Sequence, residues 1–217
     1  YELKKLNWFG LGGPAKIYFQ PESLKELSLF LKEFSKIGSI KVIGAGSNTL
    51  IRDGGYDGVI IKLGKSFSRL SLFNENTIIA GSSCLDKSVS NYAKDNSLSG
   101  FEFLSCIPGT IGGGITMNSG CYGEDISKIL ISLQVIDLEG RVKILHKQDI
   151  KFSYRETDID KNLIFISATL KGKKNNITNI KNKIDKLVKK KKKNNQKKLK
   201  LVEARLKTLK KIKLGNL

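Results

Sequence analysis

The sequence has few residues that could crosslink the chain or hold a metal ion. Its 217 residues include three cysteines (Cys84, Cys106 and Cys121) and a single histidine, His146. The cysteines are odd in number and form no Cys-x-x-Cys pair, so the sequence supports neither a disulfide framework nor a zinc site. We therefore expect reduced thiols and a cytoplasmic protein.

Long apolar runs are also missing. No run approaches the roughly 18 to 20 apolar residues that a membrane helix needs, and the chain begins at Tyr1 without a signal-like segment. The sequence thus predicts no membrane insertion, and the missing initiator methionine indicates a processed or incomplete start. With 40% hydrophobic residues, the chain can bury a core as one large domain or two small ones.

Acidic residues are scarce at one end only. The formal net charge of +19 would ordinarily indicate a nucleic-acid or anionic-membrane partner. Residues 1–172 carry 21 Lys and Arg against 18 Asp and Glu, whereas residues 173–217 carry 18 against 2. The basic character therefore belongs to a low-complexity tail. Binding of nucleic-acid phosphates by this tail is an alternative function, although the tail has no aromatic residues for base stacking.

Short apolar segments separated by turn residues predict a mixture of helices and strands. We expect helices over about residues 22–36, 85–96 and 177–188, and strands over 16–20, 40–43, 59–63, 67–73, 77–80, 131–138, 141–146 and 163–170. Their order is not the regular βαβ repeat of a doubly wound sheet.

Two segments of the chain are rich in glycine. The later one, residues 107–123, holds six of the 21 glycines and is here called the second glycine segment. Backbone without Cβ atoms can lie close to a phosphate or a planar ring. Residues 108–114 could surround a phosphate with N–H groups at the start of a short helix. The alternative is close packing of a helix against other parts of the chain.

The first glycine segment, residues 44–48, directly follows a predicted strand and reads Gly-Ala-Gly-Ser-Asn. It is not a Rossmann fingerprint, because Thr49 stands at the sixth position and residues 50–55 do not open a long helix. It could be a phosphate-binding loop or an ordinary tight turn. Two such segments in one chain favour a single extended ligand with a pyrophosphate. Arg155, further along the chain, could simply pair with a carboxylate.

The order and spacing of these elements resemble the UDP-N-acetylenolpyruvoylglucosamine reductase family, flavoenzymes of bacterial peptidoglycan precursor synthesis. The resemblance covers about residues 1–190. The segments that carry it are residues 7–13, 44–48, 100–103, 107–113, 117–120 and 154–155. Two positions depart mildly from the family pattern, with Thr157 where Ser is usual and Cys121 where Ala is common.

The resemblance implies an α+β FAD-binding fold of the vanillyl-alcohol-oxidase or p-cresol-methylhydroxylase (PCMH) type. Two subdomains, residues 1–66 and 67–172, would hold FAD between them, with the pyrophosphate on the first glycine segment. The positions that the family uses for FAD correspond to Gly44, Ala45, Gly46, Ser47, Asn48, Gly81, Pro108, Gly109, Thr110, Ile111, Gly112, Gly113, Gly114, Asn118, Gly120 and Ile166.

The resemblance also implies the reaction. In the family NADPH reduces FAD, and the flavin passes a hydride to UDP-N-acetylenolpyruvoylglucosamine, giving UDP-N-acetylmuramate. Tyr154 and Arg155 would bind this substrate, and the Arg155 cation would stabilise the negative charge that develops on it. Another flavin oxidase of the same fold is an alternative.

The family continues into a substrate-binding domain that supplies a serine proton donor and a glutamate, and this sequence shows neither. We expect residues 173–193 to form a helix leading toward that missing domain and residues 194–217 to form a basic tail. Activity of the chain as it stands would therefore be impaired.

The tail can be re-read in another frame. When residues 195–217 are shifted by one base with free choice of wobble bases, they give Gly-Gly-Ser-Thr-Phe-Lys-Asn-Pro, the family's signature for that serine. The serine falls across the codons of Glu203 and Ala204. Our hypothesis is that the reading frame is lost in the lysine run 189–193, whose codons would form an adenine tract.

Overall fold

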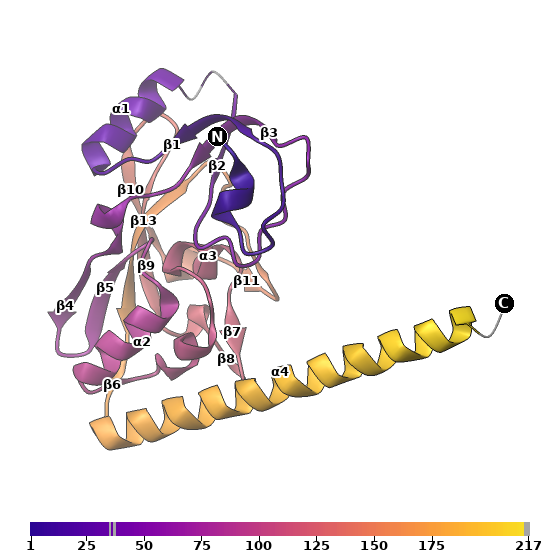
Figure 1. Cartoon of the computed structure of the whole chain (residues 1–217). Coiled ribbons are helices and arrows are strands. Elements are labelled where there is room, and N and C mark those ends of the chain that lie inside the picture. Colours follow the sequence, from indigo (N-terminus) through magenta and orange to yellow (C-terminus); the bar gives the residue numbers. More distant parts are fainter. Residues whose placement is uncertain (35, 37, 215–217) are drawn as a thin grey trace.

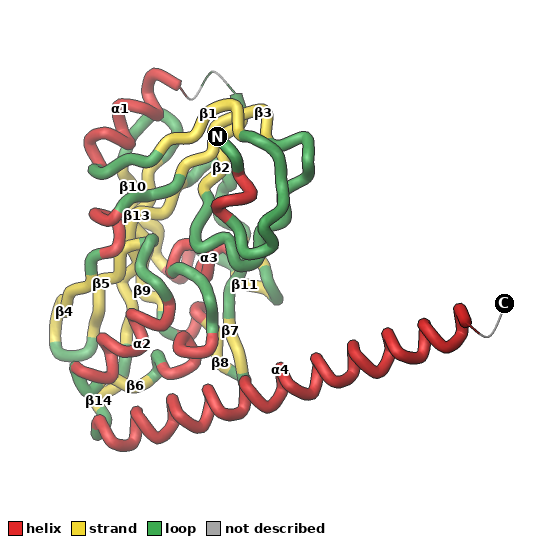
Figure 2. Tube along the Cα trace, viewed as in Figure 1, coloured by secondary structure: helices red, strands yellow, loops and turns green. Residues whose placement is uncertain are grey.

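The computed structural model describes residues 1–34, 36 and 38–214, with side chains up to residue 197. Figure 1 shows the two larger sheets one above the other along the long axis of the molecule, and a long C-terminal helix across its lower end. Both the strands of the sheets and the helices that cover them are short (Figure 2).

The first sheet is parallel, with strand order β1-β3-β2. It consists of β1 (Ala15–Phe19), β2 (Ser39–Val42) and β3 (Tyr56–Ile61), and α1 (Leu24–Phe34) connects β1 to β2. Ser23 Oγ accepts the Glu26 N–H at 3.1 Å, and Glu26 Oε2 accepts the Glu22 N–H at 2.8 Å, which fixes the start of α1. The β-α-β-β order predicted for this part of the chain is confirmed.

The second sheet has five strands in the order β10-β9-β13-β5-β4, all antiparallel to their neighbours. They are β4 (Leu70–Asn74), β5 (Thr77–Gly81), β9 (Leu130–Ile136), β10 (Val142–His146) and β13 (Ile164–Lys171). The strands predicted over residues 131–138 and 141–146 are confirmed as the antiparallel neighbours β9 and β10. The strand expected from residue 67 was wrong at its start, because residues 65–68 form a 3-10 helix that buries Phe67.

Short elements fill the space around the sheets. Helices α2 (Asp86–Asp95) and α3 (Ile111–Thr116) cover one face of the five-stranded sheet (Figures 1 and 2). The 3-10 helices are η1 (Leu3–Leu6), η2 (Lys65–Ser68), η3 (Glu102–Cys106), η4 (Ile126–Lys128) and η5 (Lys147–Asp149), and the two-residue strands are β6 (Leu98–Ser99), β7 (Gly120–Cys121), β8 (Glu124–Asp125), β11 (Phe152–Ser153), β12 (Glu156–Thr157) and β14 (Lys173–Lys174).

One hydrophobic cluster joins the two sheets. Leu27 and Leu31 of α1 pack with Val59 of β3 and with Ile136 and Ile164 of the five-stranded sheet, and all are almost completely buried. Because this shared core fixes one sheet against the other, the loop after β2 and the N-terminal end of α3 face each other. The subdomain boundary at residues 66 and 67 stays a prediction.

Helix α4 (Ile177–Leu214) extends well beyond the ends predicted for it, residue 188 from the apolar pattern and residue 193 from the family resemblance. It begins after β14, which pairs with β6, so residues 173–174 are strand rather than helix. Lys183 Nζ lies 3.4 Å from the buried Glu102 Oε2, and Lys191 donates a hydrogen bond to the Cys106 carbonyl. Most of the re-read segment 195–217 lies outside the residues whose side chains are described.

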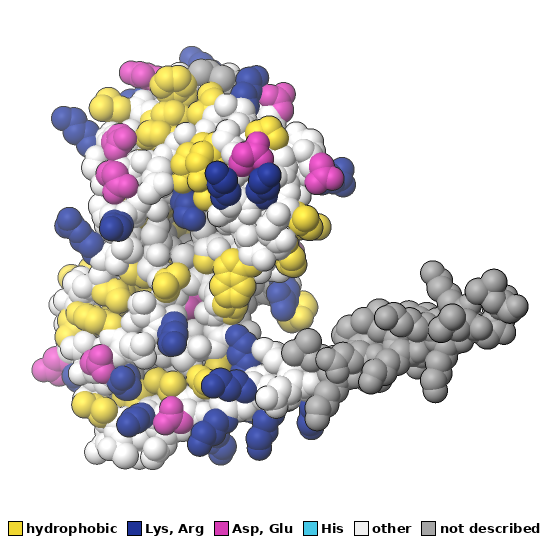
Figure 3. All heavy atoms as spheres, viewed as in Figure 1, with side chains coloured by type: hydrophobic (Ala, Val, Ile, Leu, Met, Phe, Trp, Pro, Cys, Tyr) yellow, Lys and Arg dark blue, Asp and Glu magenta, His cyan; other side chains and the backbone are white. Residues whose placement is uncertain are grey.

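Basic side chains gather along the start of α4, while the rest of the visible surface mixes both signs (Figure 3). None of the helices in the described part of the chain is long and apolar enough to cross a membrane.

Candidate functional site

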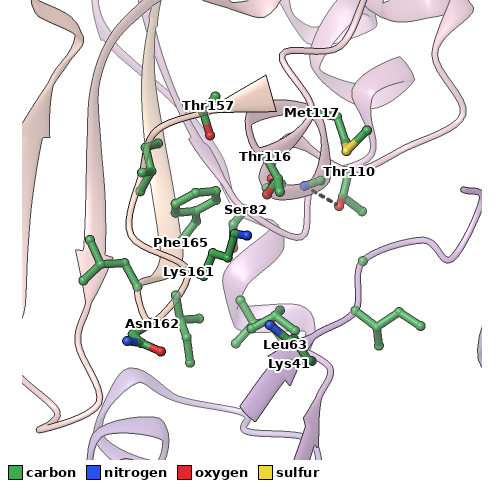
Figure 4. Close-up of a pocket in the computed structure, with 18 of the residues that line it drawn as sticks. Lys41, Leu63, Ser82, Thr110, Thr116, Met117, Thr157, Lys161, Asn162 and Phe165 are labelled. Carbon is green, nitrogen blue, oxygen red and sulfur yellow. Dashed lines mark hydrogen bonds between the residues drawn. The ribbon is translucent and has the colours of Figure 1, made fainter. Parts of the chain in front are cut away.

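A cavity of about 410 Å³ lies where the first sheet meets the five-stranded sheet. Its walls come from β2 and the two residues after it, from α3, and from residues 155–165 (Figure 4). Among the lining residues are Lys41, Val42, Gly44, Leu63, Ser82, Thr110, Gly112, Gly113, Thr116, Met117, Arg155, Thr157, Lys161 and Phe165. Five of these, Gly44, Thr110, Gly112, Gly113 and Arg155, belong to the site predicted from the sequence.

The two glycine segments touch at one wall of this cavity. A Cβ added to Gly44 would lie 2.5 Å from Thr110 Oγ1, so only glycine fits there without movement of Thr110. Thr110 is the N-cap of α3, and its Oγ1 accepts the Gly113 N–H at 3.5 Å (Figure 4). The two segments therefore meet at this wall, and their contribution to one binding site stays a prediction.

The N–H groups at the start of α3 already have acceptors inside the protein. Ile111 donates to the Cys84 carbonyl at 2.9 Å and Gly112 to the Ser82 carbonyl at 2.8 Å. Gly113 donates to the Thr110 hydroxyl, and Gly114 to the Thr110 carbonyl at 2.7 Å. These are the groups that a helix start normally offers to an anion. The second glycine segment thus lines the cavity with glycines that carry no side chain. Its N–H groups are not free to bind a phosphate, in contrast to the prediction.

The first glycine segment has the opposite arrangement. Within the described residues, the N–H groups of Ala45, Gly46, Ser47 and Asn48 donate to no protein acceptor. The Gly46 carbonyl accepts the Trp8 N–H at 3.0 Å, which ties the loop to the N-terminal segment. Gly46 is buried, Ala45 and Ser47 are half-buried, and Asn48 is exposed. Buried donors without a partner are costly unless water or a ligand satisfies them. This loop can therefore accept an anion through its backbone.

Ser82, which was not predicted from the sequence, lines the cavity with a buried hydroxyl that has no partner among the described residues. The predicted residue was its neighbour Gly81, where a Cβ would lie 2.1 Å from the Phe67 carbonyl oxygen, so that glycine has a packing role. Ile166 does not line the cavity, and its carbonyl accepts the Ser82 N–H at 2.9 Å. A serine directly after a strand-ending glycine was the signal that could have indicated Ser82.

Arg155 and Tyr154 form the turn between β11 and β12. Arg155 has a φ of +60° and lines the cavity, whereas Tyr154 is 89% exposed. The guanidinium carbon lies 5.8 Å from the centre of the Tyr154 ring, within the range of a cation–π interaction. No carboxylate among the described residues forms a salt bridge with Arg155. Its charge is thus available to the cavity.

The other predicted residues of the second glycine segment shape the site without lining the cavity. Ile111 is fully buried, and a Cβ on Gly120 would lie 2.2 Å from the Glu124 carbonyl oxygen. Asn118, with a φ of +38°, donates from its amide to the Ser153 carbonyl at 3.1 Å and so links the end of α3 to β11. Pro108, Gly109 and Gly114 also lie outside the lining.

Comparison with known proteins identifies the class. The sequence profile of the FAD binding domain family matches residues 15–146. The chain is 50% identical over 200 residues to the UDP-N-acetylenolpyruvoylglucosamine reductase of Pelagibacter ubique, covering 92% of this chain and 66% of that protein. It is 43% identical over 180 residues to the reductase of the same name from Rickettsia canadensis, covering 83% and 61%.

Solved structures give the same fold. The UDP-N-acetylenolpyruvylglucosamine reductase of Thermus caldophilus superposes with a TM-score of 0.79 at 26% identity, covering 88% of this chain and 68% of that one. Quinoline 2-oxidoreductase of Pseudomonas putida 86 superposes with a TM-score of 0.55 at 14% identity over 74% of this chain and 60% of that one, which shows the fold alone.

The chain belongs to the FAD binding domain family and has the α+β fold of the PCMH type predicted from its motifs. Within this class it is a homologue of the UDP-N-acetylenolpyruvoylglucosamine reductases, so the predicted resemblance is confirmed. It spans 61% to 66% of the length of these curated relatives.

Proposed function

We propose that this chain forms the FAD-binding part of an NADPH-dependent UDP-N-acetylenolpyruvoylglucosamine reductase, which would produce UDP-N-acetylmuramate for peptidoglycan synthesis. The observation that carries the proposal is that a cavity lies next to a loop whose backbone N–H groups have no acceptor among the described residues. The unpartnered N–H groups of residues 45–48 follow Gly44, which lines the cavity and contacts Thr110.

The residues present fit FAD. The N–H groups of residues 45–48 would hold the pyrophosphate, because successive backbone donors form a concave anion site. The unpartnered Ser82 hydroxyl would gain a hydrogen-bond partner. Gly112 and Gly113 would let a planar ring lie close to α3, since they place no side chain on this wall. Gly81, Asn118, Gly120 and Ile166, which were predicted to contact FAD, do not line the cavity and would support these segments from behind.

Bound FAD would supply the acceptor and donor of hydride between NADPH and the enolpyruvyl group. On the protein side, the Arg155 guanidinium would attract the substrate carboxylate and stabilise the negative charge that develops on it during reduction. Tyr154 would position that guanidinium through the cation–π contact.

Other functions have less support. A nucleic-acid-binding role would use the lysines of α4, but the identities of 43% and 50% extend over most of the chain and belong to reductases. The oxidoreductases that share only the fold are 12% to 14% identical. We therefore propose no specific nucleic-acid partner and no oxidase activity.

Gly113→Ala tests whether the cavity holds FAD. A Cβ at this position has the Thr110 Oγ1 as its nearest neighbour at 3.6 Å, an ordinary contact, and alanine stabilises a helix by up to about 1 kcal/mol relative to glycine. The variant should therefore fold at least as well as the wild type. Because the methyl group lies at the cavity wall, we expect FAD affinity to fall by about tenfold, roughly 1.4 kcal/mol.

The measurement is a titration of the purified chain with FAD, followed by flavin absorbance and fluorescence. Gly54→Ala is the matched control, since a Cβ there meets nothing within 4 Å and Gly54 does not line the cavity. A Gly113→Ala protein that binds FAD as tightly as Gly54→Ala would place the cofactor elsewhere.

A further inference from the structure

Asp86, the first residue of α2, is completely buried beneath the second glycine segment. A Cβ on Gly109 would lie 2.7 Å from Asp86 Oδ2, and a Cβ on Gly114 would lie 3.5 Å from Asp86 Oδ1. The carboxyl group therefore occupies space that these two glycines leave open. The Asp86 N–H also donates to the Gly109 carbonyl at 3.1 Å.

Within the described residues, the Asp86 carboxyl group forms no hydrogen bond and no salt bridge. Both Asp86 oxygens are without a partner among the described residues, and so are the buried hydroxyls of Ser90 and Ser119 nearby. A Cβ on Gly114 would lie 2.9 Å from Ser119 Oγ, so this hydroxyl and Asp86 Oδ1 approach the same glycine. A serine hydroxyl can donate to a carboxylate or accept from a carboxylic acid, so it does not decide between the two forms. A buried carboxylate without a cation loses its hydration at a large cost, and this favours the neutral acid.

We propose that Asp86 is a positioning residue for the FAD site and acts in its neutral form. Its uncharged carboxyl group packs against residues 109–114 on the side away from the cavity. When this group ionises, water enters to hydrate it, α3 is displaced and FAD binding is weakened. The proposal rests on the proposed function, since it assigns a pH response to that site. Asp86 does not line the cavity and acts through the glycine segment alone.

The electrostatic surroundings agree with this assignment. Burial raises the pKa of Asp86 to about 7, and no neighbouring charge contributes to that shift. Residues 107–120 carry no charged side chain. Cys84, whose pKa is raised to about 11 mainly by burial, titrates far from neutrality.

Charged residues on the adjoining elements have partners or face water. Lys87 on α2 is exposed. Glu102 on η3 accepts the Gly100 N–H and pairs with Lys183. Near η4, Lys128 pairs with Glu124, and Asp125 accepts the Ser127 hydroxyl. The helix dipole of α2 favours an anion at Asp86, but the loss of hydration outweighs it.

The direction of the pH dependence follows from the raised pKa. Below about pH 7 the carboxyl group is neutral and FAD affinity is at its highest, and affinity falls as the pH rises through this value. By reciprocity, bound FAD raises the pKa of Asp86 further, and each unit of that rise corresponds to a tenfold change in affinity.

The test is a series of FAD titrations from about pH 5.5 to about pH 8.5. Wild-type protein should lose about tenfold in affinity across this range. Asp86→Asn keeps the shape of the side chain but cannot ionise, so its affinity should stay constant. Asp95→Asn, at the exposed opposite end of α2, is the matched control and should follow the wild type.

A second measurement avoids any folding defect of the variant. The ¹³C resonance of the Asp86 carboxyl group should titrate near pH 7 in the wild-type protein without FAD and at higher pH with FAD. A midpoint near the ordinary aspartate value, or one that FAD leaves unchanged, would overturn the proposal. So would wild-type affinity that is equal at every pH, although FAD binding itself would then stand. Failure of the wild type to bind FAD at any pH would overturn the proposed function as well.

Discussion

The two glycine segments resemble each other in sequence and differ in what their backbones do. Among the described residues, the N–H groups of residues 45–48 have no protein acceptor, whereas every N–H group of residues 111–114 has one. Glycine serves the first segment by permitting a φ of +66° at Gly46, and it serves the second by allowing Asp86 and Ser82 to approach. The same residue type thus indicates either an open donor site or a tightly packed wall.

Hydrogen exchange should show the largest difference between the segments. Without FAD, the N–H groups of residues 45–48 should exchange close to the rate of an unfolded chain, whereas those of Ile111 and Gly112 should be protected by more than about 100-fold. Added FAD should protect residues 45–48 strongly and change Ile111 and Gly112 little. Equal protection of both segments before FAD is added would remove the distinction, and NMR or mass spectrometry can measure it.

Gly46→Ala should have the next largest effect, on stability. A Cβ there would lie 2.0 Å from the Leu6 carbonyl oxygen, and the residue also has a positive φ. The combined clash and strain should lower the free energy of unfolding by about 3 kcal/mol or more.

Gly10→Ala is the matched control for this substitution. Gly10 has a similar φ of +65°, but a Cβ there meets nothing within 4 Å. Gly10→Ala should therefore lower the free energy of unfolding through backbone strain alone, by about 1 kcal/mol. Denaturant titrations of both variants measure the two values, and equal losses would mean that contact with Leu6 does not fix the first segment.

Much of the fold could be predicted from the sequence, because apolar periodicity and turn residues mark single elements. The strand β5 and the helix α2 were placed to within one residue. Helix α4 was predicted to end at residue 188 or 193 because its lysine run reads as low complexity, although lysine is a good helix former.

The sequence indicated which segments form the site but not what the backbone of each segment does there. Glycine spacing marks both segments, but it does not say whether an N–H group meets the Cys84 or Ser82 carbonyl. Those acceptors come from the loop between β5 and α2, so only the folded chain brings them together. Lys41 and Lys161 were missed for the same reason, since they line the cavity from segments without any motif.

Ser82→Ala should have the smallest effect on the protein. It tests the cavity wall where the two glycine segments meet. The Ser82 hydroxyl is buried and has no partner in the part of the chain that the structure describes, so its removal should leave the free energy of unfolding unchanged or slightly raised. FAD affinity should fall by about tenfold if the hydroxyl binds the cofactor, equivalent to roughly 1.4 kcal/mol. Ser90→Ala removes an equally buried, unpartnered hydroxyl outside the cavity and should leave affinity at a fixed acidic pH unchanged. Equal affinities for the two variants would show that the cavity wall at Ser82 does not contact FAD, leaving the free donors of residues 45–48 as the main polar contact.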